Sequence, residues 1–434
     1  MLNLLVRRRF GPLFAVQYLG AFNDNLFRFG LLFLVTFRIM ADRPEEAATL
    51  VTLAAGLFTL PFVLFSGLAG QIVDAIDKAR VIRWVKLAEI VIMLAGAAAL
   101  WSGSIPLMLV ILFLMGLQST LFGPVKYAIL PQHLKTEEMM GGMSLIEAGT
   151  FLAILTGQIG AGLIPPEATM IAIILVAAVG YLAARAIPSA PPAPGPHPIS
   201  ANIAKSGWAV LRHLFRHRHL WLSVLVGCWF WAVGIVFTTM FLPLVQGVLG
   251  GTEEVATLFL IAFSVGIALG SLIIGKVLQG LVSARTLGVS LLLMAVATFD
   301  LVGALNAFPA PGPVPRGVGD FLAIGSSWRI LVDLTLIAVG GGSFIVPIYT
   351  IMMTGSEPAL RARTIAANNI LNSTAMVAAA GITGALVSAG LSIPDILLIG
   401  GVISILMIWP AWQLRKAVKG IDLHADDEVV PDDS

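Results

Sequence analysis

Long runs of apolar residues, separated by short polar or Pro- and Gly-containing turns, make up most of this sequence. A run of about 20 apolar residues is long enough to cross the hydrocarbon core of a bilayer. The pattern predicts twelve membrane-spanning helices, over residues 10–38, 48–74, 81–101, 105–130, 142–164, 168–187, 218–246, 254–280, 285–305, 328–354, 363–389 and 392–414. Because the number is even, both termini are expected on the same side of the membrane.

The composition indicates an integral membrane protein. Of the 434 residues 58% are hydrophobic and 12% are charged, with a mean hydropathy of +0.94, whereas roughly 25% of residues are charged in soluble domains. The first apolar run is longer than the core of a signal peptide and contains Asn23, Asp24 and Arg28. We therefore expect it to remain as the first helix. A single cysteine, Cys228, excludes an intrachain disulfide.

Lysine and arginine are distributed unevenly between the connections. Most of them lie at the N-terminus, in the 2/3 connection, in the segment between helices 6 and 7 and in the tail. The 2/3 connection is assigned four of them, Lys78, Arg80, Arg83 and Lys86. The opposite side is assigned only Arg38, Arg43, Arg316 and Arg329. By the positive-inside rule, both termini are predicted to be cytoplasmic.

The middle of the chain predicts a boundary between two bundles, residues 1–187 and 218–417. The text PSAPPAPGPHP has six prolines in eleven residues, Pro188 to Pro198, and predicts a linker. Within 188–217 the residues after this linker place apolar side chains on one helix face and basic side chains elsewhere, which is typical of a helix in the cytoplasmic lipid interface. A solvated basic connector is the alternative. The acidic residues 418–434 are expected to be disordered.

The two predicted bundles are related in sequence. Pro124 of LFGPVKYAIL corresponds to Pro347 of FIVPIYTIMM at a shift of 223, and Gly160 corresponds to Gly384 at a shift of 224. Two agreeing shifts in corresponding helices indicate a duplicated six-helix unit. Six plus six helices around a cytoplasmic linker is the architecture of major facilitator transporters.

The 2/3 connection resembles the signature that facilitators carry at this place. In GQIVDAIDKAR the matching positions are Gly70, Asp74, Lys78 and Arg80, while Asp77 stands where the signature usually has glycine. We interpret this segment as a cytoplasmic gate in which Asp74 contacts helix ends or arginines of the other bundle. A solvated turn before helix 3 is the alternative.

The stretch GAFNDNLFR places several polar side chains in the middle of helix 1. An ionisable side chain at bilayer depth costs about 2.5–3.5 kcal/mol on insertion scales and usually faces a cavity or a partner. Asp24 and Arg28 share one helix face, which Gln17 joins, and Asn23 and Asn25 flank Asp24. The group is either a structural ion pair or the polar pole of a substrate cavity. An arginine fork suits phosphate and a carboxylate suits ammonium.

Other helices also carry polar residues at depth. Helix 4 has Gln118 and Lys126, helix 5 has Glu147, and helix 11 has Asn368 and Asn372 on one face. Lys126 either snorkels to the interface or pairs with Glu147 on the neighbouring helix. The asparagines either form hydrogen bonds across helices or line the cytoplasmic vestibule.

Motifs for catalysis are missing from the sequence. The segment HLKTEE, His133 to Glu138, only partly matches an acyltransferase motif, because its acid is glutamate and it lies in a short loop. Neither GxSxG, nor a P-loop, nor a metal-spaced cluster is present. We expect a protein that is not an enzyme, with no cofactor and no nucleic-acid partner.

Three segments, GAFNDNLFR, FGPVKYAILPQHL and ARTIAANNILN, resemble the bacterial lysophospholipid transporter family of the major facilitator superfamily. The resemblance implies inward movement of lysophosphatidylethanolamine and lysophosphatidylglycerol across the inner membrane. It also implies reacylation by an acyltransferase/acyl-carrier-protein synthetase, expected here as a separate protein. Arg28 and Lys126 would then bind phosphate, and Asp24, the amides and Glu147 would bind ammonium or hydroxyls.

Two other functions remain open at this point. A proton-coupled drug or metabolite antiporter also uses buried charges, although helix 5, TFLAILTGQIGAGLI, lacks the Gly-Pro-Gly-Gly pattern of such proteins. The second alternative is a membrane scaffold for a lipid enzyme. It would not explain why both halves bury polar residues, which costs free energy in the membrane.

Overall fold

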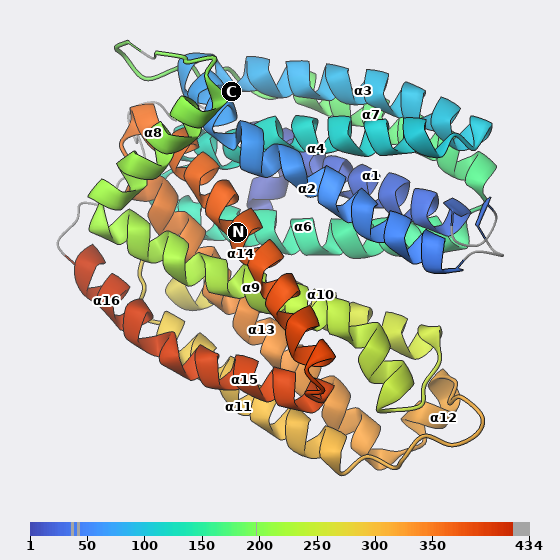
Figure 1. Ribbon diagram of the computed structural model, residues 1–434. Helices are drawn as coiled ribbons and strands as arrows, with labels where there is room; N and C mark the ends of the chain where they lie inside the picture. Colours follow the sequence, from blue (N-terminus) through green and yellow to red (C-terminus); the bar gives the residue numbers. More distant parts are fainter. Residues whose placement is uncertain (36–38, 41–43, 197, 420–434) are drawn as a thin grey trace.

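The computed structural model describes residues 1–35, 39–40, 44–196 and 198–419. Over these residues the secondary structure is helical, with no strand beyond one isolated bridge between Gly251 and Arg316. Two bundles of long helices lie side by side, the first in the blue and green part of the chain and the second in the green to red part (Figure 1). This arrangement confirms the predicted all-α membrane fold.

Each bundle contains six long segments. The N-terminal bundle comprises α1 (Gly11–Leu34), α2 (Pro44–Ala75), α3 (Lys78–Ser102), α4 (Ile105–Ala128), α6 (Thr136–Leu163) and α7 (Pro166–Arg185). The C-terminal bundle comprises α9 (Arg218–Gly247), α10 (Glu253–Leu278), α11 (Leu287–Asn306), α13 (Gly325–Thr354), α14 (Arg361–Ser388), and α15 (Ile393–Leu406) continued by α16 (Ile408–Val418). Short elements connect them: η1 (Leu2–Val6), α5 (Leu130–His133), α8 (Ile203–Arg216), α12 (Val318–Leu322) and η3 (Pro358–Leu360).

Eleven helical segments in the described part of the chain are long and apolar enough to cross a membrane, counting α15 and α16 together. The remaining long helix, α1, does not reach the same mean hydropathy, because it carries the polar stretch Asn23 to Arg28. It nevertheless packs along α6 and α7 within the bundle. Polar residues in α1 therefore lower its hydropathy without removing it from the membrane domain.

Capping residues determine helix ends that hydropathy alone misplaces. Helix α6 begins at Thr136 rather than near 142, because Glu138 accepts a hydrogen bond from the backbone N–H of Lys135 at 3.0 Å. Helix α3 begins at Lys78, where the Asp77 carboxylate accepts from the backbone N–H of Arg80 at 2.9 Å. In both helices the extra first turn is polar and lies outside the apolar run.

The bundles touch through α2 against α14 and α6 against α10. At Gly70 an added Cβ would lie 2.7 Å from the Cβ of Ala366 on α14, and at Gly275 it would lie 2.9 Å from the Cβ of Ser144 on α6. Such close approach is possible because glycine has no side chain. The helices lie closest at the end that carries α8 and α16, and they diverge toward the end that carries α12 (Figure 1).

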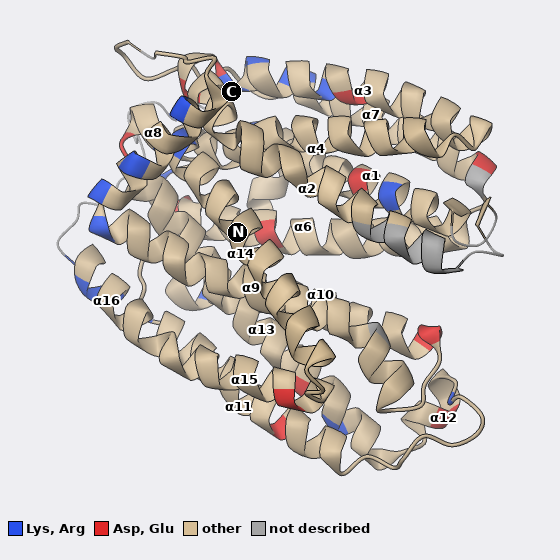
Figure 2. Ribbon diagram, in the orientation of Figure 1, with Lys and Arg blue, Asp and Glu red and all other residues tan. Residues whose placement is uncertain are grey.

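Lysine and arginine gather at the end of the molecule that carries α8 and α16 (Figure 2). This is the end predicted to be cytoplasmic, and the sidedness itself stays a prediction. Arg38 and Arg43, which were assigned to the opposite side, lie outside the described residues, as do residues 420–434 of the acidic tail. The assignment of four cations to the 2/3 connection was wrong, because Lys78, Arg80, Arg83 and Lys86 all lie in α3, and Lys86 is fully buried there.

The segment between the bundles is held mainly by α2. The backbone N–H of Ser200 donates to Gln71 Oε1 at 2.8 Å, and a Cβ on Gly67 would lie 2.6 Å from the backbone nitrogen of Gly207 in α8. Only His217 separates α8 from α9. Val210 and Leu214 on α8 are buried, whereas Trp208 is exposed. The predicted basic helix therefore has one face on the protein.

Candidate functional site: a polar network inside the N-terminal bundle

Polar side chains of α1, α3 and α4 form one hydrogen-bonded network inside the N-terminal bundle. At its centre the Lys86 ammonium lies 2.5 Å from Glu89 Oε2, and the two side chains are 0% and 2% exposed. The same carboxylate accepts hydrogen bonds from Asn23 Nδ2 and Gln118 Nε2, each at 3.2 Å. Glu89 is thus satisfied by one cation and two amide donors, which a buried ion pair needs to offset its desolvation.

Local sequence explains the position of Lys86. It lies three residues before Glu89 on α3, so both side chains leave the same helix face. A Cβ at Gly20 of α1 would overlap the Lys86 ammonium, and the Phe122 ring lies 5.0 Å away on another side. Sequence reasoning missed this pair, although the spacing of Lys86 and Glu89 within an apolar run could have revealed it.

Asp24 joins this network through α4. The Ser119 hydroxyl donates to Asp24 Oδ2 at 2.8 Å and also lies 3.1 Å from Gln118 Oε1. Since the hydroxyl has a single proton, it can donate to only one of them at a time. The chain of contacts therefore runs from Asp24 through Ser119 and Gln118 to Glu89.

Arg28 and Asp24 share a helix face but do not form an ion pair in the described structure. The Arg28 guanidinium donates to Asn25 Oδ1 at 3.4 Å and lies over the rings of Phe29 and Phe58, 5.3 and 5.6 Å from their centroids. These are cation–π contacts. The half-buried guanidinium consequently has no carboxylate partner among the residues described, which argues against the structural ion pair.

The three amide side chains of α1 that were singled out in the sequence all have protein partners. Asn23 Nδ2 also donates to the Ile173 carbonyl at 3.1 Å, and Asn25 Nδ2 donates to the Ala21 carbonyl at 2.8 Å. Gln17 donates to the Ile146 carbonyl and accepts from Thr150 on α6. Both ends of the Gln17 amide are occupied, which favours a structural role for this residue.

A second polar group lies between the bundles, roughly two turns further along α4, since Tyr127 follows Ser119 by about eight residues. Tyr127 donates to Glu147 Oε1 at 2.6 Å, and its ring stacks on that of Tyr349 from α13. The Tyr349 hydroxyl accepts from Trp231 Nε1 and from Asn368 Nδ2, both at 3.3 Å. Residues of α4, α6, α9, α13 and α14 therefore meet at this point.

Lys126 is not the hydrogen-bonding partner of Glu147 that its neighbouring position suggested. Its ammonium lies 4.7 Å from the centroid of the Tyr127 ring, and no ion pair joins Lys126 to Glu147 in the part of the chain that is described. The carboxylate is instead held by the Tyr127 hydroxyl. A tyrosine therefore supplies the contact that one of the two alternatives had assigned to the lysine.

The N-terminal half of α14 presents amide groups to the space between the bundles. Asn369 lies beside Gly123 of α4, where a Cβ would be 3.0 Å from its Nδ2. Asn368 Oδ1, Asn369 Nδ2 and Asn372 Oδ1 are buried and have no protein partner among the described residues. Buried polar groups normally find a partner, so these amides are available to water or to a ligand.

Asp74 connects the bundles at the closed end. Its Oδ1 accepts from the backbone N–H of Ala362 at 3.0 Å, and its Oδ2 accepts from that of Arg363 at 3.3 Å. The Arg363 Nε also lies 3.4 Å from this carboxylate. A carboxylate at the first turn of α14 is stabilised by the N–H groups and the helix dipole. Asp74 thus makes the kind of contact expected of it, and its gating role stays a prediction.

The other signature residues are placed differently. Lys78 is buried and its backbone N–H donates to the Ala190 carbonyl at 2.9 Å, whereas the Arg80 side chain is exposed. Asp77 accepts from the Ser189 hydroxyl at 2.5 Å and from the Ala190 N–H at 3.0 Å. Burial by itself would raise the pKa of the Asp77 carboxyl. The hydrogen bonds outweigh this effect and hold its pKa below the usual range. The aspartate in place of glycine therefore fastens the linker to the start of α3.

The segment that partly matches an acyltransferase motif does not bring its histidine and acid together as a pair. The Glu138 carboxylate binds Arg9 through two hydrogen bonds of 2.6 and 2.7 Å. His133 is fully buried, and burial lowers its pKa to about 4. Within the described residues there is also no cluster of three or more His, Cys, Asp or Glu side chains placed to hold a metal ion.

Comparison with known proteins identifies the fold family. A family model described as Major Facilitator Superfamily matches residues 17–314. The chain belongs to this superfamily. Among curated relatives of this facilitator, the lysophospholipid transporter LplT of Enterobacter sp. (strain 638) is 26% identical over 412 residues, covering 93% of this chain and 95% of that protein. LplT of Citrobacter koseri gives the same identity and coverage. With its many apolar helices and bacterial relatives, this facilitator is a multi-pass protein of the bacterial inner membrane.

Solved facilitator structures have the same fold. The E. coli fucose:proton symporter FucP aligns with a TM-score of 0.69 at 15% identity, covering 93% of this chain and 98% of that one. The human organic anion transporter MFSD10 aligns with a TM-score of 0.71 at 14% identity, covering 92% and 99%. At these identities the likeness shows the fold alone.

Proposed function

We propose that this facilitator moves lysophospholipids, such as lysophosphatidylethanolamine and lysophosphatidylglycerol, inward across the bacterial inner membrane by alternating access. The observation that carries the proposal is the half-buried Arg28 guanidinium, which has no carboxylate partner among the described residues although Asp24 is one turn away. The similarity to LplT proteins over 93% of the chain supports the substrate class.

The network leaves two opposite charges for a ligand. Lys86 and Glu89 neutralise each other, so they contribute no net charge to the site. Arg28 offers a planar set of donors that suits the oxygens of a phosphate. Asp24 is held by Ser119 at one oxygen, and its other oxygen can accept from an ammonium or hydroxyl group. A lysophospholipid headgroup carries these groups next to each other.

The conformation fits the uptake step of such a cycle. The bundles are closed at the end of Asp74 and Arg363, which the charge distribution predicts to be cytoplasmic. Toward the other end, Gly381 and Gly384 of α14 have open space around them. A headgroup would enter from this open end, and release would require separation of Asp74 from α14 and of Tyr127 from Tyr349.

Delivered lysophospholipid would need a second acyl chain to become a bilayer lipid again. We therefore propose a separate acyltransferase/acyl-carrier-protein synthetase as the partner in metabolism. The second candidate function is a proton-coupled drug or metabolite antiporter, which the buried Glu147 carboxylate favours because its only described hydrogen bond is to the Tyr127 hydroxyl.

Transport of labelled lysophosphatidylethanolamine from the outer to the inner leaflet tests the proposal. We would compare wild type, Arg28→Ala and Arg28→Lys in cells lacking their own uptake route, with membrane levels measured for each. A hydrogen bond to a charged group contributes about 1.5–3 kcal/mol, so Arg28→Ala should lower uptake by about 10- to 100-fold. Arg185→Ala, an exposed cation at the end of α7, is the matched control and should transport normally.

The outcomes separate the candidates. Loss of uptake in Arg28→Ala but not in Arg185→Ala supports a phosphate site on α1. If Arg28→Ala takes up lysophospholipid as well as wild type does, the proposed function stands and Arg28 is not part of the binding site. If wild type moves no lysophospholipid but exports a drug against a proton gradient, the antiporter is the correct function.

A further inference from the structure

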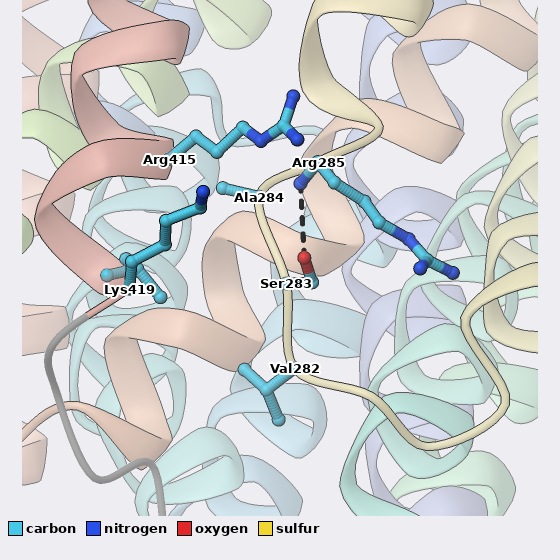
Figure 3. Close-up of a pocket in the computed structure, with 7 residues that line it drawn as sticks. Val282, Ser283, Ala284, Arg285, Arg415 and Lys419 are labelled. Carbon is cyan, nitrogen blue, oxygen red and sulfur yellow. Dashed lines mark hydrogen bonds between the residues drawn. The ribbon is translucent and has the colours of Figure 1, made fainter.

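A cavity of about 380 Å³ lies between the α10–α11 connection and α16, away from the polar network. It is lined by Val282, Ser283, Ala284, Arg285, Arg415, Val418 and Lys419 (Figure 3). Three of these seven residues are cations and none is an acid. The function proposed above makes no use of this cavity.

The three cations differ in their ion pairing from other cations near the same end of the described structure. No ion pair to Arg285, Arg415 or Lys419 is formed by any residue that the structure describes, whereas Arg9 and Arg363 near the same end pair with Glu138 and Asp74. Arg415 and Lys419 are four residues apart on one face of the chain, where like charges repel. An anion in the cavity would remove this repulsion.

Figure 3 shows how these cations are arranged around the connection. The side chains of Arg415 and Lys419 lie on the same side of it, beside Ala284, and the Arg285 guanidinium extends away on the other side. The backbone N–H of Arg285 is bound to the Ser283 hydroxyl at 3.3 Å. Arg415 and Lys419 therefore form the cationic centre of the cavity, and Arg285 is a third, peripheral charge.

The surroundings place the cavity at the level of lipid headgroups. Trp409 and Trp412 on α16 are 66% and 46% exposed, and exposed tryptophans of membrane proteins concentrate at the membrane–water interface. Lys416 lies over the Trp412 ring, 3.4 Å from its centroid. Val282 and Val418 add an apolar wall. Basic pockets at this level on the cytoplasmic side bind the headgroups of anionic lipids.

We propose that this cavity binds the phosphate headgroup of an anionic phospholipid, with Arg415 and Lys419 as the main contacts. Cations in the last turn of α16 also complement the helix dipole, but that effect does not account for Arg285, which comes from a different segment. A bound headgroup would join the α10–α11 connection to α16 by charge. The proposal is independent of the lysophospholipid site.

Thermal unfolding of the purified full chain in detergent tests this site. We would titrate phosphatidylglycerol, phosphatidylcholine and inorganic phosphate into wild type, Arg415→Gln/Lys419→Gln and the charge-preserving Arg415→Lys/Lys419→Arg. The control is Lys135→Gln/Arg185→Gln, which removes two exposed cations elsewhere. Near a membrane each cation contributes about 1 kcal/mol to binding of anionic lipid, so the Gln pair should weaken phosphatidylglycerol binding by about 30-fold, as about 1.4 kcal/mol corresponds to tenfold.

The expected result is saturable stabilisation of wild type by phosphatidylglycerol, retained in the Lys/Arg exchange and in the control, and lost in the Gln pair. Equal binding by wild type and the Gln pair overturns the proposal. If inorganic phosphate stabilises wild type as much as phosphatidylglycerol does, the conclusion that the phosphate belongs to a lipid is overturned.

The chain's own acidic tail is tested in the same assay. In a further full-length variant the six acids among residues 422–433 are replaced by Asn or Gln. If this variant binds phosphatidylglycerol with the same affinity as wild type, the lipid is supported as the occupant of the cavity. A tenfold gain in affinity overturns the proposal, because the tail would then be the occupant. Because the readout is binding and not transport, failure of this proposal is distinguishable from failure of the proposed function.

Discussion

Tyr127 of α4 and Tyr349 of α13 stack face to face across the interface between the bundles, with ring centroids 4.7 Å apart and planes 9° apart. The two helices correspond in the internal repeat, and each contains a proline a short distance before its tyrosine, Pro124 and Pro347. The stack therefore joins corresponding helices of the two halves.

We predict that Tyr349→Ala shifts the protein away from the closed-gate conformation. An aromatic pair contributes about 0.5–1.5 kcal/mol beyond its buried area, so the ratio of the two states should change by about 2- to 10-fold. Spin labels at Leu163→Cys and Trp328→Cys, both exposed near the other end, would report a larger population of short distances in a Cys228→Ser background. Tyr181→Ala is the control, and an unchanged distribution in Tyr349→Ala would contradict the prediction.

Gly70→Ala should open the contact between α2 and α14. The new Cβ would come within 2.7 Å of the Ala366 Cβ and 3.0 Å of the Arg363 Cα, and overpacking of this kind costs about 1–3 kcal/mol. A cysteine at the buried position Ala367 should then react at least about fivefold faster with a maleimide added to inside-out vesicles. Gly56→Ala, also in α2 but with open space around it, should leave the rate unchanged. Equal rates in both variants would show that the contact at Gly70 does not limit opening.

Lys86→Met should destabilise the protein strongly, because it leaves the Glu89 carboxylate buried without a cation. Removing one partner of a buried pair typically costs about 3–5 kcal/mol. Lys86→Met/Glu89→Gln should recover most of this loss in denaturant unfolding, since the second change removes the charge and keeps an acceptor for Asn23. The exposed pair of Arg329 and Asp300 is the comparison, and Arg329→Met should leave the midpoint nearly unchanged. A double variant as unstable as Lys86→Met would mean that lost packing, not charge, is responsible.

Stability should depend on pH through His133. Burial lowers its pKa from 6.5 to about 4, so between these values the unfolded chain binds a proton that the folded protein does not. The contribution is fully present above pH 6.5 and is lost as pH falls toward 4, by about 3 kcal/mol in total. His133→Gln should reduce the difference in unfolding free energy between pH 7.5 and 5 without removing it, because burial also lowers the pKa of His213, while His217→Gln should retain the full difference. A slope as steep in His133→Gln as in wild type would assign the effect to other groups.

The apolar runs were sufficient to predict the helices but not all of their ends. Helix α4 begins at Ile105 as expected, and α13 begins at Gly325 instead of 328. The start of α6 was misplaced by six residues, because the turn from Thr136 is polar and depends on a capping contact of Glu138. Hydropathy measures partition into lipid, and it does not measure the hydrogen bonds that extend a helix beyond the membrane.

The candidate site was predictable only in part. The polar stripe of Asp24 and Arg28 on α1 follows from residue spacing, but their partners come from other helices through tertiary packing. Asp24 meets Ser119, and Arg28 meets Phe58. Lys86 was assigned to a loop because positive charge near a helix start usually marks the membrane surface. The ion pair with Glu89 and the space beside Gly20 show that this lysine turns inward.

The linker between the bundles is fastened along most of its length to the N-terminal bundle. Asp77 binds Ser189 and Ala190, Gln71 binds Ser200, and α8 lies on α2. The covalent joint to the C-terminal bundle is therefore reduced to His217, the one residue between α8 and α9. A joint of this length has almost no slack, so the bundles can swing about it but cannot slide apart. We therefore expect the bundles to pivot about this one residue during transport, when the predicted gate between Asp74 and α14 opens.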